Sequence, residues 1–431
     1  MTLLTARGAP TGSDPADAPP RRTTLPNGLT VLSAPVPRVR SVAFGAFVRA
    51  GSLHEARATM GVAHLLEHMV FKGTPTRTAR QLSLDVETLG GSLDAYTTRE
   101  YTSYQARLLA ADLAVAADVI GDLVFRPLLR DEDLALERNV ILEEIGTMED
   151  TPDDLVFELH NTLLWGDHPH GYSILGTRET VSALTTADVR AVHARAYHPA
   201  QIVVTAAGNV EHERLVDVLL ATGWGDIPAG DAAPLPTVPP RVQPPTYRHV
   251  TNKELTQTHV VFGAPGVSHA DPRRDALALV STVLGGGMSS RLFQTVREEL
   301  GLAYAVHTTQ SVHADAGTHG VYLASAPKTA RKAADAVRRE YARLHAEGLP
   351  VAELDAAKRQ LRGQVLLGAD SVTNAMYRAA ETMLFEEPYR TLDEVVARID
   401  AVTPDDVRAL CADLYDPERQ TVLSLGPKPV A

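Results

Sequence analysis

Two histidines and a glutamate within five residues form the strongest chemical pattern in this chain. The segment His64-Leu65-Leu66-Glu67-His68 places its two histidines four residues apart. Positions i and i+4 of a helix lie on one face, with β-carbons roughly 5–6 Å apart. Two imidazoles in that arrangement can converge on one small cation, and Glu67 points to nearly the same side. The segment therefore predicts a metal site with a carboxylate beside it.

The order of these residues narrows the chemistry. His-x-x-Glu-His reverses the commoner His-Glu-x-x-His order, in which two histidines bind zinc and a glutamate acts as general base. The alternative interpretation is an amphipathic core helix with incidental polar residues. A third ligand on another element would favour the metal site, because a catalytic zinc usually has three protein ligands and an open position for water.

The best source of a third ligand is a helix expected over residues 131–148. Glu137 and Glu144 lie two turns apart on one face of that helix, whereas Glu143 points about 100° away from Glu144. Unpaired carboxylates are rarely buried, so a metal and its imidazole ligands would explain the pair. A solvated acidic face is the alternative. The buried stripe of this helix is marked by Leu134, Ile141 and Ile145.

Taken together, these residues resemble the motif of the pitrilysin-type (M16) metallopeptidases. His68 is followed, after 75 residues, by Glu144. The resemblance extends from about Thr24 to Gly426 and, more narrowly, is to short bacterial members similar to mitochondrial processing peptidase. It implies one Zn²⁺ per chain, bound by His64, His68 and Glu144, with Glu67 as the general base. Ligand type alone does not exclude manganese or cobalt.

The resemblance assigns a supporting role to Glu137, seven residues before the third ligand. Partners of this kind orient metal ligands and tune their basicity without binding the metal. In the second half, Arg297 and Tyr304 match the family's Arg/Tyr pair, which reaches across the interdomain cavity towards substrate. From the residues alone, Arg297 is an ordinary surface arginine.

A third part of the resemblance concerns an edge strand that pairs with an extended substrate. Strand addition uses main-chain hydrogen bonds, so it tolerates varied peptide sequences. Asn is usual in the family where Asp94 stands here. The substrate-binding residues implied in this strand are Asp94, Ala95, Tyr96 and Thr97.

A proline-rich segment divides the chain almost in half. Seven prolines between Pro228 and Pro245 exclude a helix or a central strand, so residues 223–247 are interpreted as a semi-rigid linker. The halves resemble each other at a constant offset of 218 residues. Ten of 24 positions are identical between residues 185–208 and 403–426, and Phe44-Gly45-Ala46 matches Phe262-Gly263-Ala264. This repetition predicts two copies of one domain.

The predicted organisation is a disordered tail over residues 1–21, a catalytic metal-binding α+β domain over 22–222, the linker, and a second α+β domain over 248–431. The second domain is expected to be metal-free, because Thr282, Gly285 and Gly286 stand where the first has His64, Glu67 and His68. Each domain is expected to be a mainly antiparallel sheet with helices packed on one face, and the two to form a clam-like chamber. Expected strands include 29–32, 42–49 and 202–207; expected helices include 81–89, 110–123, 131–148 and 188–197.

Composition sets the remaining expectations. The 431 residues are 44% hydrophobic and 22% charged, as in ordinary globular proteins. The net charge of −12 and the absence of a long Lys/Arg run argue against nucleic-acid binding. No apolar stretch approaches the roughly 18–20 residues of a membrane span, and the N-terminus lacks the apolar centre of a secretory signal. Cys411 is the single cysteine, which excludes an intrachain disulfide and fits a reducing compartment; we expect a cytoplasmic protein.

The function expected from the resemblance is zinc-dependent endopeptidase activity on peptides or unfolded segments held in extended form inside the chamber. A homodimer is expected in preference to a heterodimer with a related chain, because this chain has both the metal motif and the Arg/Tyr pair. The alternative is a catalytically silent scaffold or a peptide-binding subunit of the same fold.

Overall fold

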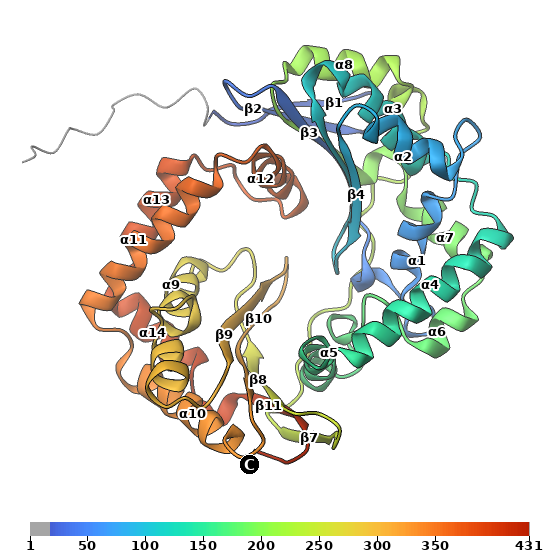
Figure 1. Ribbon diagram of the computed structural model, residues 1–431. Helices are drawn as coiled ribbons and strands as arrows, with labels where there is room; N and C mark the ends of the chain where they lie inside the picture. The colour runs from blue at the N-terminus through green and yellow to red at the C-terminus, as the bar shows by residue number, and fades with distance from the viewer. Residues whose placement is uncertain (1–17, 431) are drawn as a thin grey trace, which may run out of the picture.

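The computed structural model describes residues 18–430. Residues 1–17 of the expected disordered tail lie outside the described residues. Arg21, the last residue of the expected tail, belongs to a strand instead. The described chain forms two sheets that face each other, with the main layers of helices on their outer sides (Figure 1). This is the two-lobed α+β architecture expected from the sequence.

The first sheet has six strands in the order β1-β2-β6-β3-β5-β4. All neighbours are antiparallel except β2 and β6, so the expected mainly antiparallel sheet is confirmed. The strands are β1 (Arg21–Thr24), β2 (Thr30–Pro35), β3 (Ser41–Val48), β4 (Ser92–Thr97), β5 (Thr102–Leu109) and β6 (Ile202–Gly208).

The helices of the first half differ from expectation mainly at their ends. The helix expected over 110–123 is a 3₁₀ turn, Ala110–Asp112, followed by α3, because Asp112 adopts a non-helical conformation. The helix expected over 81–89 begins two residues earlier, where Thr78 caps it, and ends before Gly90, whose φ of +74° starts a turn. The helices are α1 (Val62–Val70), α2 (Ala79–Glu87), α3 (Leu113–Phe125), α4 (Asp131–Asp150), α5 (Pro152–Trp165), α6 (Arg178–Ala183), α7 (Thr186–Ala196) and α8 (His212–Ala221).

The second half repeats the plan with a five-stranded sheet in the order β7-β11-β8-β10-β9. A π-helical segment, Phe293–Glu299, precedes β9. The strands are β7 (Tyr247–Thr251), β8 (Thr258–Pro265), β9 (Ala305–Val312), β10 (Gly317–Ser325) and β11 (Thr421–Gly426). The helices are α9 (Arg274–Gly285), α10 (Ala330–Glu347), α11 (Val351–Gly368), α12 (Val372–Leu384), α13 (Leu392–Ala401) and α14 (Pro404–Leu414).

The sequence repeat has a local structural cause at its most similar segment. Helices α7 and α14 occupy the same positions at the 218-residue offset. Thr185 and Thr403 cap these helices. The hydroxyl of each threonine accepts a hydrogen bond from the backbone N–H three residues later. In return, the side chain of Asp188 or Asp406 accepts from the backbone N–H of its threonine. Such a capping box satisfies backbone donors that a helix start leaves unpaired. The matched Thr and Asp therefore fix where both helices begin.

One helix from each half packs against the sheet of the other half; we call α5 and α12 the exchanged helices. Helix α5 packs on β8 and β11 of the second sheet, and α12 packs on β2, β3 and β6 of the first. Helices thus cover one face of each sheet as a layer, as expected, and a single helix of the opposite half covers part of the other face. For this reason β3 is buried along almost its whole length instead of alternating.

The repeated Phe-Gly-Ala segments lie where these exchanged helices cross the sheets. A β-carbon on Gly263 of β8 would lie 2.4 Å from Cε1 of His160 in α5, and one on Gly45 of β3 would lie 3.0 Å from Sδ of Met376 in α12. Both strands therefore need a residue without a side chain at this point. The two Phe-Gly-Ala segments are therefore similar because each half contains the same kind of contact between a helix and a strand glycine.

The predicted linker is attached to the first half at several points. Trp224 is buried, and its indole N–H donates to the carbonyl of Ala117 over 3.0 Å. His168 lies 3.0 Å from the carbonyl of Val238. After a 3₁₀ turn at Trp224–Asp226, the chain has no regular structure until β7 begins at Tyr247, as the prolines predict.

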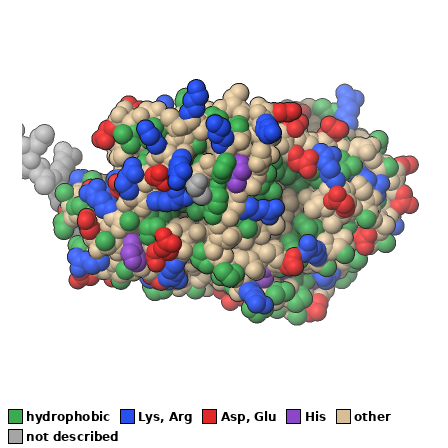
Figure 2. Space-filling view, turned by 90° about the horizontal axis from the view of Figure 1, so that it is seen from below, with side chains coloured by type: hydrophobic (Ala, Val, Ile, Leu, Met, Phe, Trp, Pro, Cys, Tyr) green, Lys and Arg blue, Asp and Glu red, His purple; other side chains and the backbone are tan. Residues whose placement is uncertain are grey.

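No helix within residues 18–430 is long and apolar enough to cross a membrane. On the face shown in Figure 2, Lys and Arg side chains are interspersed with Asp and Glu rather than gathered into one basic surface.

Candidate metal centre

The metal-motif helix α1 is anchored at its start by a buried carboxylate. Gly61, with φ of +91°, precedes the helix and has no side chain with which to cap it. Instead, the carboxylate of Glu55 accepts hydrogen bonds from the backbone N–H groups of Gly61 and Ala63, both at 2.8 Å. Sequence reasoning missed Glu55; the available signal was an acidic residue shortly before a helix whose N-cap is glycine.

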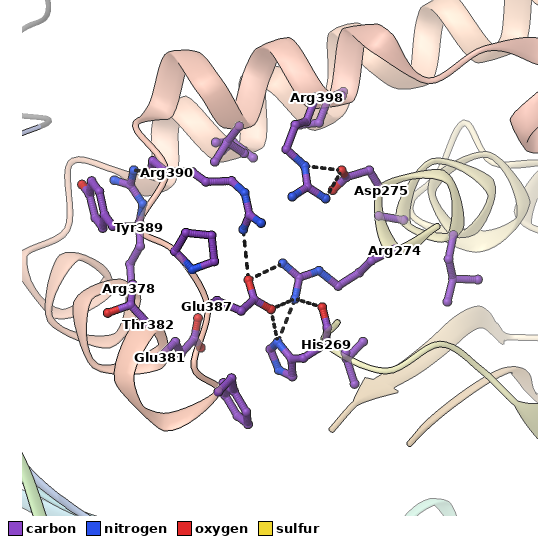
Figure 3. Close-up of a pocket in the computed structure, with 18 of the residues that line it drawn as sticks. His269, Arg274, Asp275, Arg378, Glu381, Thr382, Glu387, Tyr389, Arg390 and Arg398 are labelled. Atoms are coloured by element: carbon purple, nitrogen blue, oxygen red, sulfur yellow. Dashed lines mark hydrogen bonds and ion pairs between the residues drawn. The ribbon is translucent and has the colours of Figure 1, made fainter. Parts of the chain in front are cut away.

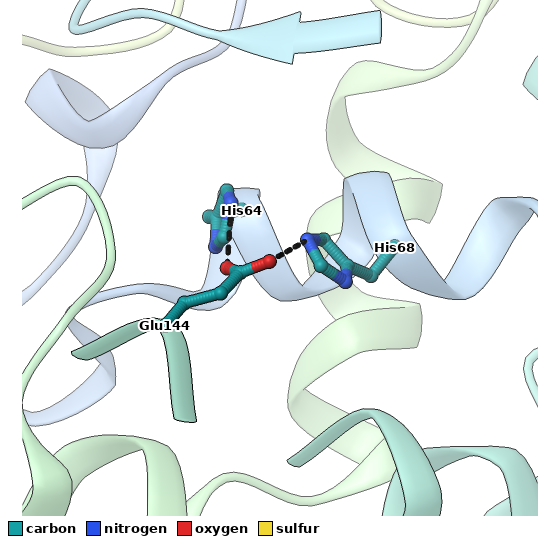
Figure 4. Close-up of side chains that lie close together, drawn as sticks. All are labelled: His64, His68 and Glu144. Atoms are coloured by element: carbon teal, nitrogen blue, oxygen red, sulfur yellow. Dashed lines mark ion pairs between the residues drawn. The ribbon is translucent and has the colours of Figure 1, made fainter. Parts of the chain in front are cut away.

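The structure brings the three expected ligands together. His64 and His68 project from one face of α1, and Glu144 reaches them from α4; Figure 4 shows its carboxylate pointing towards both imidazoles. The Glu144 oxygens lie 3.8 Å from Nε2 of His64 and 3.7 Å from Nε2 of His68. The three ligand atoms all lie within 4.8 Å of one another.

These residues fit a zinc ion. Zn²⁺ binds imidazole nitrogen and carboxylate oxygen at about 2.0–2.2 Å. An ion can therefore lie between a Glu144 oxygen and a histidine Nε2 that are 3.7–3.8 Å apart. Burial and the neighbouring His68 lower the pKa of His64 to about 4. Its imidazole is therefore neutral at pH 7, with a lone pair available to a metal. Three protein ligands also leave room for a water molecule, as in catalytic zinc sites.

Glu137 supports His68 from the side away from Glu144. Its Oε2 lies 3.1 Å from Nδ1 of His68, and its side chain is only 7% exposed. Its other oxygen lies 2.5 Å from the ammonium of Lys72. Glu137 therefore contacts a candidate ligand and is not itself part of the three-residue cluster. Lys72 was not predicted from the sequence, although it follows His68 by four residues, as His68 follows His64.

Glu67 lies beside the ligands with its carboxylate held in place. The hydroxyl of Thr97 donates to Oε2 of Glu67 over 2.5 Å. Burial raises the pKa of Glu67 above its ordinary value, against the opposing effect of this hydrogen bond. A carboxylate with a raised pKa is a better proton acceptor near neutral pH.

Thr97 is the last residue of β4, so the edge strand and the metal motif meet. Within the part of the chain that the structure describes, β4 pairs only with β5, and its outer edge carries no further strand. Such an edge is open to an added extended chain. Asp94 accepts from the backbone N–H of Ala95 over 2.9 Å, and the hydroxyl of Tyr96 lies 3.3 Å from that of Tyr101.

Arg297 and Tyr304 lie together, immediately before β9. The guanidinium of Arg297 lies 5.2 Å from the ring centroid of Tyr304, which is 74% exposed. Tyr304 immediately precedes β9. Just after the opposite end of β9, the chain contacts the first half, where the backbone N–H of Ala314 donates to Glu100 over 2.7 Å. The eight residues of β9 span about 26 Å. The pair therefore lies at the end of β9 remote from the turn that follows β4.

A separate cavity of about 400 Å³ lies within the second half, lined by α9, α11, α13 and the loop after α12 (Figure 3). Glu387 is its hub, because its carboxylate lies 2.5 Å from Arg274, 2.9 Å from His269 and 3.1 Å from Arg390. These charges pair with one another across the cavity. They hold the loop after α12 against α9 and take no part in the metal centre.

Three buried histidines outside the motif have packing roles. His160, His168 and His170 are all buried. His160 lies 3.1 Å from the carbonyl of Thr421 in the second sheet, and His170 lies 3.3 Å from Asp315. They contribute to the contact between the halves.

Comparison with known proteins agrees with this architecture. Residues 30–178 match the family model described as "Insulinase (Peptidase family M16)", and residues 183–361 match "Peptidase M16 inactive domain". A protein of Streptomyces coelicolor is 40% identical over 412 residues, covering 94% of this chain and 89% of the relative. One of Bacillus subtilis is 34% identical over 395 residues, covering 92% and 95%. Both are named "uncharacterized zinc protease".

Two crystal structures share the fold at low sequence identity. A peptidase M16 inactive domain from Pseudomonas fluorescens has a TM-score of 0.88 at 22% identity, covering 95% of this chain and 98% of its own. A protease from Helicobacter pylori also has a TM-score of 0.88, at 19% identity, covering 95% and 99%. The resemblance seen in the sequence is confirmed, and the chain belongs to peptidase family M16.

Proposed function

We propose that this chain is a zinc-dependent endopeptidase that cleaves peptides or unfolded segments bound in extended form. The observation that carries the proposal is the convergence of His64, His68 and Glu144 on one point, with the partly buried carboxylate of Glu67 on the same helix. The names of the relatives from Streptomyces and Bacillus support the choice of zinc.

A zinc ion at this point would lower the pKa of a water molecule and polarise the scissile carbonyl. Glu67 would act as the general base, accepting a proton from the attacking water and later returning it to the leaving amine. Its raised pKa suits both steps, because the protonated acid is then not too strong to persist until the amine departs. Thr97 keeps the carboxylate orientated through its hydrogen bond.

Substrate binding is assigned to the outer edge of β4. An extended peptide added there would pair with the backbone of Asp94, Ala95 and Tyr96. Because Thr97 of the same strand bonds to Glu67, the register of the peptide and the position of the base are fixed by one element. Main-chain recognition of this kind implies broad sequence tolerance.

We propose further that the chain works as a homodimer in which Arg297 and Tyr304 serve the metal centre of the partner copy. Both lie at the end of β9 remote from the β4–β5 turn of their own chain, and Tyr304 is 74% exposed. In the partner's site they would hold the substrate backbone, and Tyr304 would help to stabilise the developing oxyanion.

The decisive experiment combines metal analysis with degradation of a mixed fluorogenic peptide library, with and without chelator. The wild-type chain should contain one zinc and lose activity on chelation. Glu67→Gln should keep its zinc while cleavage falls roughly 10²–10⁴-fold. Glu143→Gln, at an exposed neighbouring position on α4, is the matched control and should leave both unchanged.

Two results would contradict the proposal. If Glu67→Gln cleaves at the normal rate, the base is another group. If the zinc-loaded wild-type chain binds peptides without cleaving any of the library, the chain is a peptide-binding or scaffold subunit of the same fold.

A further inference from the structure

We infer that Lys72 is a positioning residue of the metal centre, which holds Glu137 against His68 and thereby orients one metal ligand. The inference rests on the proposed metal centre but not on peptide cleavage. It concerns a residue that follows α1 and contacts no expected ligand directly.

The geometry forms a continuous chain of contacts. The ammonium of Lys72 lies 2.5 Å from Oε1 of Glu137, and Oε2 of the same carboxylate lies 3.1 Å from Nδ1 of His68. One carboxylate therefore bridges a cation and an imidazole, using one oxygen for each. With Nδ1–H of His68 donating to Glu137, its Nε2 is left as the acceptor atom, and this is the nitrogen that faces Glu144.

Burial makes the lysine necessary. The side chain of Glu137 is 7% exposed, against 32% for Lys72 and 17% for His68. A buried carboxylate without a charged partner is strongly unfavourable. The imidazole is neutral when it serves as a metal ligand, so the full positive charge beside Glu137 comes from Lys72. Without that ammonium we expect Glu137 to turn towards water and leave His68 without its acceptor.

The backbone of Lys72 is itself held where α1 meets α4. Its N–H donates to the carbonyl of Met69 over 3.2 Å. Its carbonyl accepts from Arg130 over 3.2 Å, and Arg130 in turn bonds Asp133 over 2.6 Å. The ammonium is therefore directed at Glu137 by contacts with both helices.

Removing the lysine has two opposing effects on metal affinity. It abolishes the repulsion between an ammonium and a dication, which favours binding. It also releases the carboxylate that fixes His68, which opposes binding. Because the ammonium lies 2.5 Å from a carboxylate that offsets its charge, we expect the repulsion to be weak and the loss of orientation to prevail.

The test measures zinc affinity of the metal-free full chain by competition with a chromogenic chelator. Lys72→Met should bind zinc 10–100-fold more weakly, the range found when a partner of a metal ligand is removed. Lys72→Arg, which restores the charge and a donor, should recover affinity to within about threefold. Lys332→Met on the exposed face of α10 is the matched control and should bind as the wild type.

A second background shows whether Lys72 acts through Glu137. In a Glu137→Gln chain the carboxylate is absent, so adding Lys72→Met should cause no further loss of affinity. If Lys72→Met does not fold, Lys72→Gln is measured with the same expectations.

Each contrary result overturns the inference. Wild-type or tighter zinc binding by Lys72→Met, no recovery with Lys72→Arg, or an equal loss in both backgrounds would show that Lys72 does not orient the ligand. Failure of the wild-type chain itself to bind zinc would instead remove the metal centre. Normal zinc behaviour without peptide cleavage would leave the inference standing and refute the proposed peptidase.

Discussion

At the scale of single residues, several groups at the candidate metal centre each make two contacts. Glu137 contacts His68 and Lys72, and Thr97 ends a strand and donates to the proposed base, Glu67. His68 is contacted by Glu137 at Nδ1 and by Glu144 at Nε2. Substitutions here should separate metal binding from proton transfer.

Replacing Glu144 with glutamine should abolish stoichiometric zinc binding. The amide is neutral and a poor ligand, and the two imidazoles alone leave the ion without its third protein ligand. Metal analysis after dialysis against a weak chelator measures the result. Glu143→Gln on the adjacent, exposed position is the control, and full retention of zinc by Glu144→Gln would exclude Glu144 as a ligand.

Glu55 should make stability fall as the pH rises. Burial raises its pKa from 4.5 to about 7, against two opposing backbone hydrogen bonds. A raised pKa means that the folded state holds the proton more tightly, so this contribution is complete below pH 4.5 and is lost as the pH rises through 7. The melting temperature of the wild type should therefore decline relative to Glu55→Gln between pH 5 and 8. A constant difference across that range would contradict the assignment.

The residue types of the site were readable from the sequence because their spacing within α1 and α4 is local. His64, His68 and Glu144 follow from helical periodicity and the family motif. Glu55 and Lys72 were not found, because each acts through a contact whose partner is set by the packing of separate elements. Periodicity along one helix carries no information about such contacts.

At the scale of elements, the exchanged helices α5 and α12 account for the buried glycines. Gly263→Ala should destabilise the fold by about 1–3 kcal/mol, because its β-carbon would lie 2.4 Å from buried His160. Gly45→Ala should cost less, since its nearest contacts, Sδ of Met376 and Cε2 of Phe47, both lie at 3.0 Å and the methionine side chain is flexible. Chemical denaturation measures both values.

A double substitution tests this explanation. Adding Gly263→Ala to a His160→Ala chain should cause little further destabilisation, because the clashing ring is gone. An undiminished cost in that background would place the strain elsewhere in β8.

The strands and helices that the sequence analysis expected by range in the first half have the predicted type, but the crossing of α5 and α12 did not follow from the sequence. Strands, caps and the repeat are local or periodic features. The choice of which sheet a helix covers depends on tertiary packing, and an apolar helix face is the same for either sheet. The Phe-Gly-Ala match was visible as a repeat, whereas its cause was visible only in three dimensions.

At the scale of the whole molecule, the position of Arg297 and Tyr304 leads to a test by mixing. One chain carries Glu67→Gln and the other carries Arg297→Ala with Tyr304→Phe, so neither homodimer has a complete site. After subunit exchange, each mixed dimer has one complete site if the pair acts on the partner. We expect about a quarter of wild-type peptidase activity, because roughly half of the dimers are mixed and each has one working site of two.

Activity no higher than that of the separate variants would show that the pair serves its own chain. A strict monomer by mass measurement at the assay concentration would also exclude the dimer. Neither result would bear on zinc binding.

The exchanged helices also have a consequence for synthesis on the ribosome. When β6 emerges, the first sheet is complete, yet the strands that α12 will cover stay bare until residues 372–384 have been made. At about 5–20 residues per second that interval lasts on the order of 10–35 s. During it, a nascent chain with an uncovered apolar sheet is a client for chaperones, and a truncated first half is expected to aggregate unless the missing helix is supplied as a separate fragment.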